Sequence, residues 1–380
     1  MIRLFSRLRL AVLAAVFALP AVYAQATDYP VTVTDLAGRK VEIKSEPKRI
    51  VLQDGRDLFT LALLDRQDPL SRVVVWNNIL ARSDSKGWAA FEKKWPTSAA
   101  KPIDMKFGDD GQVNMEEIVA AKPDLVIVHA RVKQALEDAH VLESLKSLGV
   151  PVVMIDSEME PAVNAVKSVE LLGKVLNRES EAKDYVDFYL SHQKTVNDAI
   201  AGLKKPKVFF EALAGKKGPE FCCFTHGDVY WGKLVQASGG DNLGTKMLNS
   251  RTGDVTLESI IGAEPDFYMM SGTPFADPAA VSPAFGFDAD RKGIETAMAK
   301  LAARPGFSNI KAVKSGNVYG LYHQLYSSVW NIYAIEYMAK AFHPEAMKAV
   351  DPDADLNTIL TKMTGLGDEK VIFGAKLDAK

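Results

Sequence analysis

Aromatic, arginine and histidine side chains follow several apolar runs in this chain of 380 residues. Flat aromatic faces combined with fixed cations suit a large, partly apolar, anionic ligand. If the runs are parallel strands, these side chains gather at carboxyl ends, where open α/β sheets bind ligands. The candidate ligand-binding residues on this criterion are Gln53, Arg56, Trp76, His129, Arg131, His226, Tyr230, Trp231, Arg251, His323, Tyr326 and Trp330.

Each candidate also has a purely structural alternative. His129 can instead hydrogen-bond a backbone group, and Trp330 can instead be a hydrophobic-core residue on its helix. Three of the candidates are histidines, and three imidazoles in one cleft would suit direct binding of a metal ion. We assign no catalytic residue and no metal ligand, but we keep direct metal binding open as an alternative.

Cys222 and Cys223 are the only cysteines, so a disulfide framework cannot stabilise the fold. Neighbouring Cα atoms lie about 3.8 Å apart across a trans peptide, below the usual disulfide range. Two thiolates alone do not complete a metal site, and only His226 is close in sequence. Two interpretations remain: small apolar residues in a loop, or a vicinal disulfide in the cleft wall.

The first half alternates strand-like and helix-like stretches. Residues 31–34 and 40–43 predict an opening hairpin. Short apolar runs follow, separated by helical patterns, and one of these spans 132–148 and ends at Gly149. Such alternation predicts a mainly parallel sheet covered on both faces. The expected strands cover residues 49–52, 72–75, 124–128 and 151–155.

Residues 179–203 predict one amphipathic helix, about 25 residues and ~37 Å long at 1.5 Å per residue. Its place in the middle of the chain favours a helix that joins two lobes, although an ordinary lobe helix is the alternative. Beyond it we expect strands at 207–211, 266–270 and 317–321, and a long loop at 273–290. The expected helices of this second half cover residues 229–238, 256–263, 294–302 and 328–342.

One pattern occurs twice, in residues 114–127 (NMEEIVAAKPDLVI) and 255–268 (VTLESIIGAEPDFY). In both, a glutamate lies two residues before an isoleucine and seven before a Pro-Asp pair that opens an apolar run. Each copy predicts a helix, a proline stop and a buried strand. The fold class we expect is α/β, with two Rossmann-like lobes joined by one long α-helix. The lobes would be residues 27–178 and 204–380.

Residues 1–26 are typical of a cleaved export signal, with Arg3, Arg7 and Arg9 before an apolar run of about ten residues. Such a run is too short to span ~30 Å of hydrocarbon. Cleavage after Ala24 or Ala26 would release about 355 residues, enough for two domains. The net charge of −2 argues against a nucleic-acid partner. We therefore expect a soluble periplasmic monomer.

The chain resembles the periplasmic substrate-binding proteins of ABC importers for iron–siderophores, haem and vitamin B12. The resemblance covers nearly the whole mature chain and rests on residues 33–39 (VTDLAGR), 47–51 (PKRIV), 114–127, the linking helix and 238–243 (SGGDNL). It implies that Glu116 and Glu258, one per lobe, dock against arginines of the membrane permease dimer. Glu117 is the competitor of Glu116, because the neighbouring pair leaves the register open by one residue.

Within that family, residues 323–328 (HQLYSS) through 343–345 (HPE) are most similar to ferric-siderophore binders. The resemblance implies capture of a ferric chelate, limited closure about the stiff helix, and no cofactor or catalysis. Arg56, Arg131 and Arg251 would offset the charge of the chelate. Haem with a Tyr or His axial ligand is the nearest alternative. A tetrapyrrole-processing enzyme is a further alternative, but we find none of the usual catalytic signatures.

Overall fold

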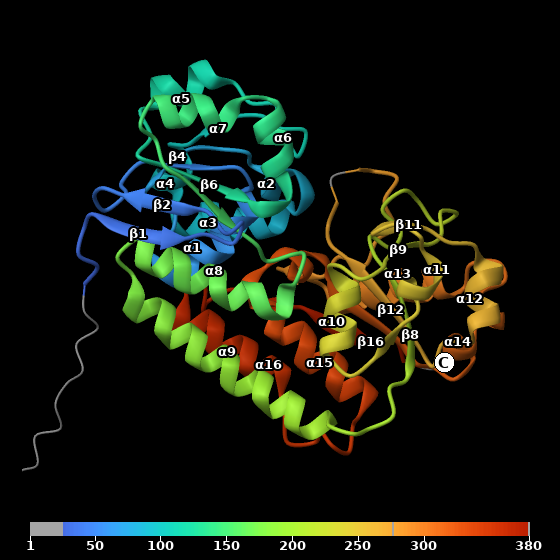
Figure 1. The fold of residues 1–380 in the computed structure, drawn as a ribbon. Coiled ribbons are helices and arrows are strands. Elements are labelled where there is room, and N and C mark those ends of the chain that lie inside the picture. Colours follow the sequence, from blue (N-terminus) through green and yellow to red (C-terminus); the bar gives the residue numbers. More distant parts are fainter. Residues whose placement is uncertain (1–25, 276, 379–380) are drawn as a thin grey trace, which may run out of the picture.

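The computed structural model describes residues 26–275 and 277–378 as two α/β lobes above one long helix (Figure 1). The expected export signal lies almost entirely outside these residues. Within the described part of the chain, no helix combines the length and the apolar character needed to cross a bilayer. The expected fold class is confirmed.

The N-terminal lobe is built on a five-stranded parallel sheet, preceded by the antiparallel hairpin β1 (Val31–Thr34) and β2 (Lys40–Ile43). Its strand order is β5 (Ile103–Asp104), β4 (Val73–Trp76), β3 (Ile50–Leu52), β6 (Leu125–His129) and β7 (Val152–Ile155). Successive residues of β6 alternate between two apolar clusters, with Leu125 in one and Val126 in the other. Both faces are covered, which explains why this strand reads as an unbroken apolar run.

Helices lie on both faces of this sheet (Figure 1). α1 (Leu58–Leu64) and α8 (Pro161–Val175) contribute to one cluster, and α5 (Met115–Ala121), α6 (Lys133–Asp138) and α7 (Val141–Ser147) to the other. The single helix expected at 132–148 is therefore wrong. His140 has φ 56, a left-handed conformation that ends α6 and starts α7. α2 (Ile79–Ser83), α3 (Ser85–Lys94) and α4 (Pro96–Ala99) complete the lobe.

The C-terminal lobe has a mixed sheet in which β8 (Lys207–Glu211), β12 (Phe267–Gly272) and β14 (Val318–Tyr322) run parallel. Antiparallel strands extend it at both edges: β9 (Phe224–His226) and β11 (Thr252–Asp254) beyond β8, and β16 (Gly374–Lys376) beyond β14. β10 (Asp241–Asn242) also pairs with β8, and β13 (Gly286–Phe287) pairs with β15 (Val371–Ile372). The three central strands were predicted from the sequence; the edge strands were not.

Four of the seven α-helices in the described part of this lobe overlap the expected ranges, and the other three, at 244–247, 311–314 and 352–358, were not predicted. The seven are α10 (Trp231–Ala237), α11 (Gly244–Met247), α12 (Leu257–Ala263), α13 (Arg291–Ala302), α14 (Lys311–Lys314), α15 (Ile332–Phe342) and α16 (Pro352–Thr358). The expected helix at 328–342 begins instead as a short 3-10 turn, and the α-helix starts at Ile332.

α9 (Glu179–Ile200) has 22 residues and runs beneath both lobes (Figure 1). Tyr189 on α9 donates a hydrogen bond to Asn331 Oδ1 at 2.7 Å, and Trp330 Nε1 donates to the Phe59 carbonyl at 3.1 Å. Residues near the C-terminus thus return to pack on α9 and on the N-terminal lobe. One apolar cluster continues through both lobes, so packing as well as α9 holds them together.

The duplicated unit adopts the same structure in both lobes. Asn114 caps α5 and Thr256 caps α12, with side-chain oxygens accepting from backbone amides of the first turn. Lys122 and Glu264 then take the left-handed conformation, with φ 49 and 51, and end the two helices. A Pro-Asp pair follows in each copy, as the sequence pattern predicts.

The aspartate of each Pro-Asp pair anchors the neighbouring strand. Asp124 accepts from the backbone amides of Lys48 and Arg49, both at 2.8 Å, at the start of β3. Asp266 accepts from the backbone amide of Lys207, at 2.9 Å, at the start of β8. A basic side chain at the start of each of these strands then contacts the end of the helix. Arg49 donates to the Ala121 carbonyl of α5, and Lys207 donates to the Ala263 carbonyl of α12.

Candidate ligand-binding site

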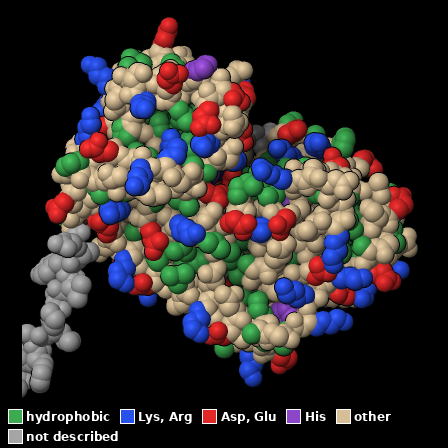
Figure 2. Space-filling model, viewed as in Figure 1, with side chains coloured by type: hydrophobic (Ala, Val, Ile, Leu, Met, Phe, Trp, Pro, Cys, Tyr) green, Lys and Arg blue, Asp and Glu red, His purple; other side chains and the backbone are tan. Residues whose placement is uncertain are grey.

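A cavity of about 390 Å³ lies between the two lobes and takes its walls from both. Figure 2 shows the surface hollowed between the lobes, with acidic and basic side chains interspersed over this face. The N-terminal wall follows the carboxyl ends of β3, β4, β6 and β7, as expected for an open α/β sheet. The C-terminal wall includes residues of β9, of the turn before α10 and of the segment after β14.

Seven of the twelve predicted ligand-binding residues line this cavity. They are Gln53, Arg56, Arg131, His226, Tyr230, His323 and Tyr326. Four of them form an aromatic group on the C-terminal wall, where Tyr326 lies 5.9 Å from His226, 5.5 Å from Tyr230 and 4.8 Å from His323 between ring centroids. The structure therefore brings together residues that are up to 273 positions apart between Gln53 and Tyr326.

Three tryptophans expected to offer stacking faces lie in the core instead. Trp76 packs edge-on against Trp88, with centroids 5.0 Å apart, and Trp231 stacks on Phe210 at 4.4 Å. Trp330 is buried against Phe59. All three are at most 2% exposed. These tryptophans lie near strand and helix ends, as predicted, but their rings pack in the hydrophobic core and do not face the cavity.

His129 and Arg251 also differ from the expectation. His129 is buried behind the cavity wall, where its Nε2 lies 3.2 Å from the Asp57 carboxylate. Burial opposes the charged imidazolium, but Asp57 outweighs it and raises the pKa of His129. Arg251 is exposed outside the cavity, while its neighbour Thr252 lines it. The three-imidazole cleft is therefore wrong: only His226 and His323 line the cavity.

Arg56 occupies the floor of the cavity and is fully paired. Its Nε donates to Asp54 Oδ1 at 2.9 Å, and its Nη2 donates to Asp54 Oδ2 at 2.5 Å and to Glu158 Oε1 at 3.3 Å. Its Nη1 donates to the Tyr326 phenol at 2.7 Å and to Ser327 Oγ at 3.1 Å. Asp54 is buried, which opposes its charge, yet Arg56 holds the pKa of that carboxyl well below its usual range.

Arg131 lies beside Arg56 and shares its carboxylates. Nη1 donates to Glu158 Oε2 at 2.6 Å, and Nη2 donates to Asp109 Oδ1 at 3.0 Å and to Asp54 Oδ2 at 3.4 Å. Nε donates to Asp109 Oδ2 at 3.1 Å. The two guanidiniums and three carboxylates form one network, which the sequence analysis missed. Glu158 lies just beyond the end of β7, so the strand-end rule applied to that strand would have found it.

The two histidines of the cavity are neutral. Burial lowers the pKa of His226 to about 3. Burial also lowers the pKa of His323, and nearby His226 and Arg56 lower it further. His323 Nδ1 lies 2.8 Å from Ser271 Oγ, and His226 Nδ1 accepts from the Trp231 amide at 3.4 Å. Each ring is thereby oriented through Nδ1 and presents an uncharged surface to the cavity.

Two groups of three potential metal ligands occur among the described residues, and neither belongs to this cavity. One is His192 of α9 with Glu336 of α15 and Asp355 of α16. The other is Glu211 with Cys222 and Cys223, where Glu211 is already bound by Arg304 Nη1 at 2.8 Å and the two cysteines form a disulfide. Of the two interpretations of the cysteine pair, the structure has the vicinal disulfide.

A second cavity of about 500 Å³ adjoins the first, and the two share Leu213 and Phe224 as lining residues. Cys222 and the exposed ring of Phe221 line it as well. The vicinal disulfide thus lies in a wall next to the cleft.

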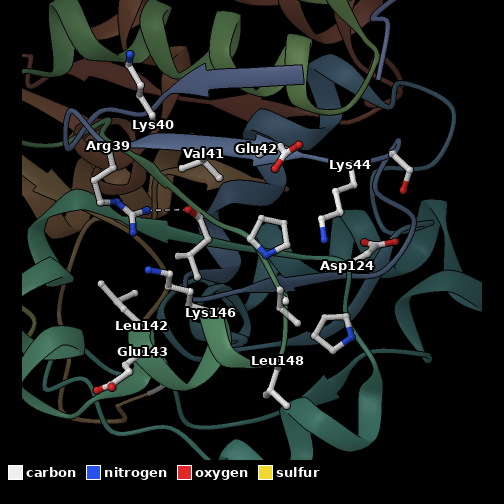
Figure 3. Close-up of a pocket in the computed structure, with 16 residues that line it drawn as sticks. Arg39, Lys40, Val41, Glu42, Lys44, Asp124, Leu142, Glu143, Lys146 and Leu148 are labelled. Atoms are coloured by element: carbon white, nitrogen blue, oxygen red, sulfur yellow. Dashed lines mark hydrogen bonds between the residues drawn. The ribbon is translucent and has the colours of Figure 1, made fainter. Parts of the chain in front are cut away.

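A larger hollow, of about 830 Å³, lies elsewhere, at the amino ends of β6 and β7 (Figure 3). Its charged side chains are exposed and of both signs, including Lys40, Glu42, Lys44 and Lys146. Arg39 donates from Nη2 to the Val152 carbonyl there, at 2.7 Å. Since parallel sheets bind ligands at the opposite ends of their strands, the smaller cavity between the lobes is the better candidate.

The glutamates of the two copies of the duplicated unit, Glu116 and Glu258, lie at equivalent exposed positions. Glu116 and Glu258 are each the second residue after the capping side chain, on α5 and α12 respectively. Glu117 aligns with Ser259, so the structure places Glu116 rather than Glu117 in register with Glu258. α5 and α12 lie far apart, one on each lobe (Figure 1).

With this geometry in place, comparison with known proteins identifies the family. A family described as periplasmic binding protein matches residues 61–325. The chain belongs to that family. It is 26% identical to an uncharacterised ABC transporter substrate-binding lipoprotein, YvrC, of Bacillus subtilis, over 84% of this chain and 88% of that protein. It is 25% identical to the Fe(3+)-citrate-binding protein YfmC of Bacillus subtilis, over 56% of this chain and 58% of that protein.

Among solved structures, the fold is similar to the TroA-like periplasmic binding protein FepB from Veillonella parvula. The TM-score is 0.84 at 27% identity, and the match covers 92% of this chain and all of that chain. Sequence and structure thus agree that this chain is a two-lobed substrate-binding protein of the ABC-transporter type.

Proposed function

We propose that this protein captures a ferric chelate of siderophore type in the cavity between its lobes and delivers it to an ABC importer permease. The observation that carries the proposal is one cavity walled by both lobes, with the aromatic and imidazole rings of His226, Tyr230, His323 and Tyr326 on one side. Such rings supply contact area for a large, partly apolar chelate. The proposal requires no chemistry on the cargo.

Delivery rests on the two exposed glutamates. Glu116 and Glu258 lie on different lobes, so a permease with a basic residue opposite each would bind best when the lobes hold one relative position. Export would place the protein in the periplasm, where such a permease is reached. Sequencing the N-terminus of the mature protein tests export: it should begin at Gln25 or Thr27, and a chain that still begins at Met1 would contradict it.

Calorimetric titration of the purified protein tests the cargo. The panel contains a ferric trihydroxamate, a ferric tris-catecholate, ferric citrate, haem, cobalamin and free Fe³⁺. We expect at least one ferric chelate to bind, and Tyr230→Ala to weaken that binding by about tenfold or more. Leu142→Ala, in the large hollow of the N-terminal lobe, is the control and should leave it unchanged. Binding of none of the ferric chelates would contradict the proposal.

Haem is the second candidate, and the neutral histidines favour it. An uncharged imidazole or a tyrosine serves as an axial haem ligand, and His226, His323 and Tyr326 all line the cavity. Visible absorption separates the two candidates. A ligated haem would give a shifted Soret band that His323→Ala abolishes, whereas a siderophore carrier would show no such His323-dependent band.

A further inference from the structure

We infer that the cavity selects chelates whose net charge is zero or positive and discriminates against anionic ones. The inference rests on the proposed function and concerns only the charge of the cargo. It reverses the expectation that Arg56 and Arg131 offset the charge of an anionic chelate. The relevant groups of the cavity are these two guanidiniums, the carboxylates of Asp54, Asp109 and Glu158, and the uncharged rings of the C-terminal wall.

Arg56 has no donor left for a ligand. A guanidinium has five N–H donors, and those of Arg56 are directed at Asp54, Glu158, Tyr326 and Ser327. Its side chain is 9% exposed and that of Glu158 is 2% exposed, so these pairs are screened little by water. An anionic ligand would have to separate a buried ion pair before Arg56 could bind it.

Arg131 is nearly as fully engaged. Four of its contacts go to carboxylate oxygens of Asp54, Asp109 and Glu158. The side chain of Arg131 is 12% exposed, whereas that of its partner Asp109 is 63% exposed. Both residues line the cavity, and the carboxylate of Asp109 is the more accessible of the two charges to a ligand that enters from solvent.

The remaining lining residues add no positive charge. No lysine occurs among the described residues that line the cavity, and His226 and His323 are neutral because of their burial. Three carboxylates therefore face two guanidiniums, which leaves the cavity with one excess negative charge. A neutral or cationic chelate fits this field without breaking the network, and an anionic chelate is repelled.

Calorimetry with three ferric chelates of different charge tests the inference: a linear trihydroxamate with a free ammonium group, a neutral trihydroxamate, and an anionic tris-catecholate. We expect the first two to bind at least about tenfold more tightly than the third. Equal or tighter binding of the tris-catecholate would overturn the charge inference alone. Binding of none of the three would overturn the proposed function and the inference with it.

Asp109→Asn sharpens the test. The change removes the negative charge and one of the two oxygens that accept from Arg131, so the ratio of cationic to anionic affinity should fall by about three- to tenfold. Asp110→Asn is the matched control, because Asp110 is a neighbouring exposed carboxylate that pairs with Lys106 at 3.4 Å and does not line the cavity. An unchanged ratio in Asp109→Asn, or an equal fall in Asp110→Asn, would contradict the inference.

Discussion

Arg56 Nη1, in the N-terminal lobe, donates a 2.7 Å hydrogen bond to the phenol oxygen of Tyr326, in the C-terminal lobe. The same guanidinium reaches Ser327 Oγ, and Ser157 Oγ donates to the Ser327 carbonyl at 2.8 Å. The floor of the cavity is therefore bonded across the two lobes. Any closure of the cavity over its cargo has to take place about this floor.

Tyr326→Phe tests that link. The variant keeps the ring but leaves one donor of the buried Arg56 without its acceptor, so the free energy of unfolding should fall by about 1–3 kcal/mol. Urea denaturation measures the change. Tyr29→Phe, which removes a phenol that donates to the Val175 carbonyl away from the cavity, is the control and should cost less. A Tyr326→Phe protein as stable as the wild type would show that the contact contributes nothing.

The two exposed glutamates should act in delivery and not in capture. Glu116→Ala together with Glu258→Ala should reduce uptake of the chelate by about tenfold or more in cells carrying the permease, because both lobes lose their docking charge. The Kd of the purified double variant should stay unchanged. Glu117→Ala, one position out of register, is the control for uptake. Loss of chelate binding in the double variant would contradict this division of roles.

Acid should destabilise the protein through His226. Its folded pKa of about 3 lies below the ordinary value, so below pH ~6.5 the unfolded chain binds a proton that the folded protein excludes. That contribution is lost as pH falls, by about 1.4 kcal/mol per pH unit. Between pH ~7.5 and ~5, His226→Gln should therefore lose about 2 kcal/mol less than the wild type.

Urea denaturation at the two pH values measures this difference. His140→Gln, a change on the surface, is the control and should lose as much stability as the wild type. If His226→Gln and the wild type lose equal stability on acidification, the neutral, buried state of His226 is wrong.

The duplicated unit predicts matched effects in the two lobes. Asp124→Ala removes the acceptor of two backbone amides at the start of β3, and Asp266→Ala removes the acceptor of one backbone amide at the start of β8. These aspartates are half-buried, so each change should lower the free energy of unfolding by about 1 kcal/mol. Thermal denaturation compares them with Asp277→Ala, on the exposed loop after β12. A large effect in one lobe only would show that the two copies are not equivalent.

Much of the fold was predictable because its signals are local. The turn before Pro123 and Pro265, the capping residues Asn114 and Thr256, and the apolar run of β6 each depend on neighbours in sequence. The edge strands were not predictable in this way. β9, β11 and β16 have three residues each in regular register and are defined by the strands they pair with. The break at His140 is set by a backbone conformation that the residue type does not specify.

The cavity was predictable in position but not in charge. The strand-end rule predicted that Arg56, Arg131 and Tyr326 lie together, and all three line the cavity, since the rule depends only on sheet topology. It could not show that Glu158 and Asp109 would neutralise the arginines, because those contacts join loops from different strands. Nor could it separate tryptophans of the wall from tryptophans of the core, since both kinds of position favour large apolar rings.

Hydrogen–deuterium exchange with and without a neutral ferric trihydroxamate tests the central claim most directly. If the chelate binds between the lobes, protection should appear in both walls together, at residues 53–57 and 130–131 of the N-terminal lobe and at 224–231 and 323–327 of the C-terminal lobe. Residues 39–45 and 142–152, around the 830 Å³ hollow of the N-terminal lobe, should not change. Protection confined to one lobe, or centred on that hollow, would contradict capture between the lobes.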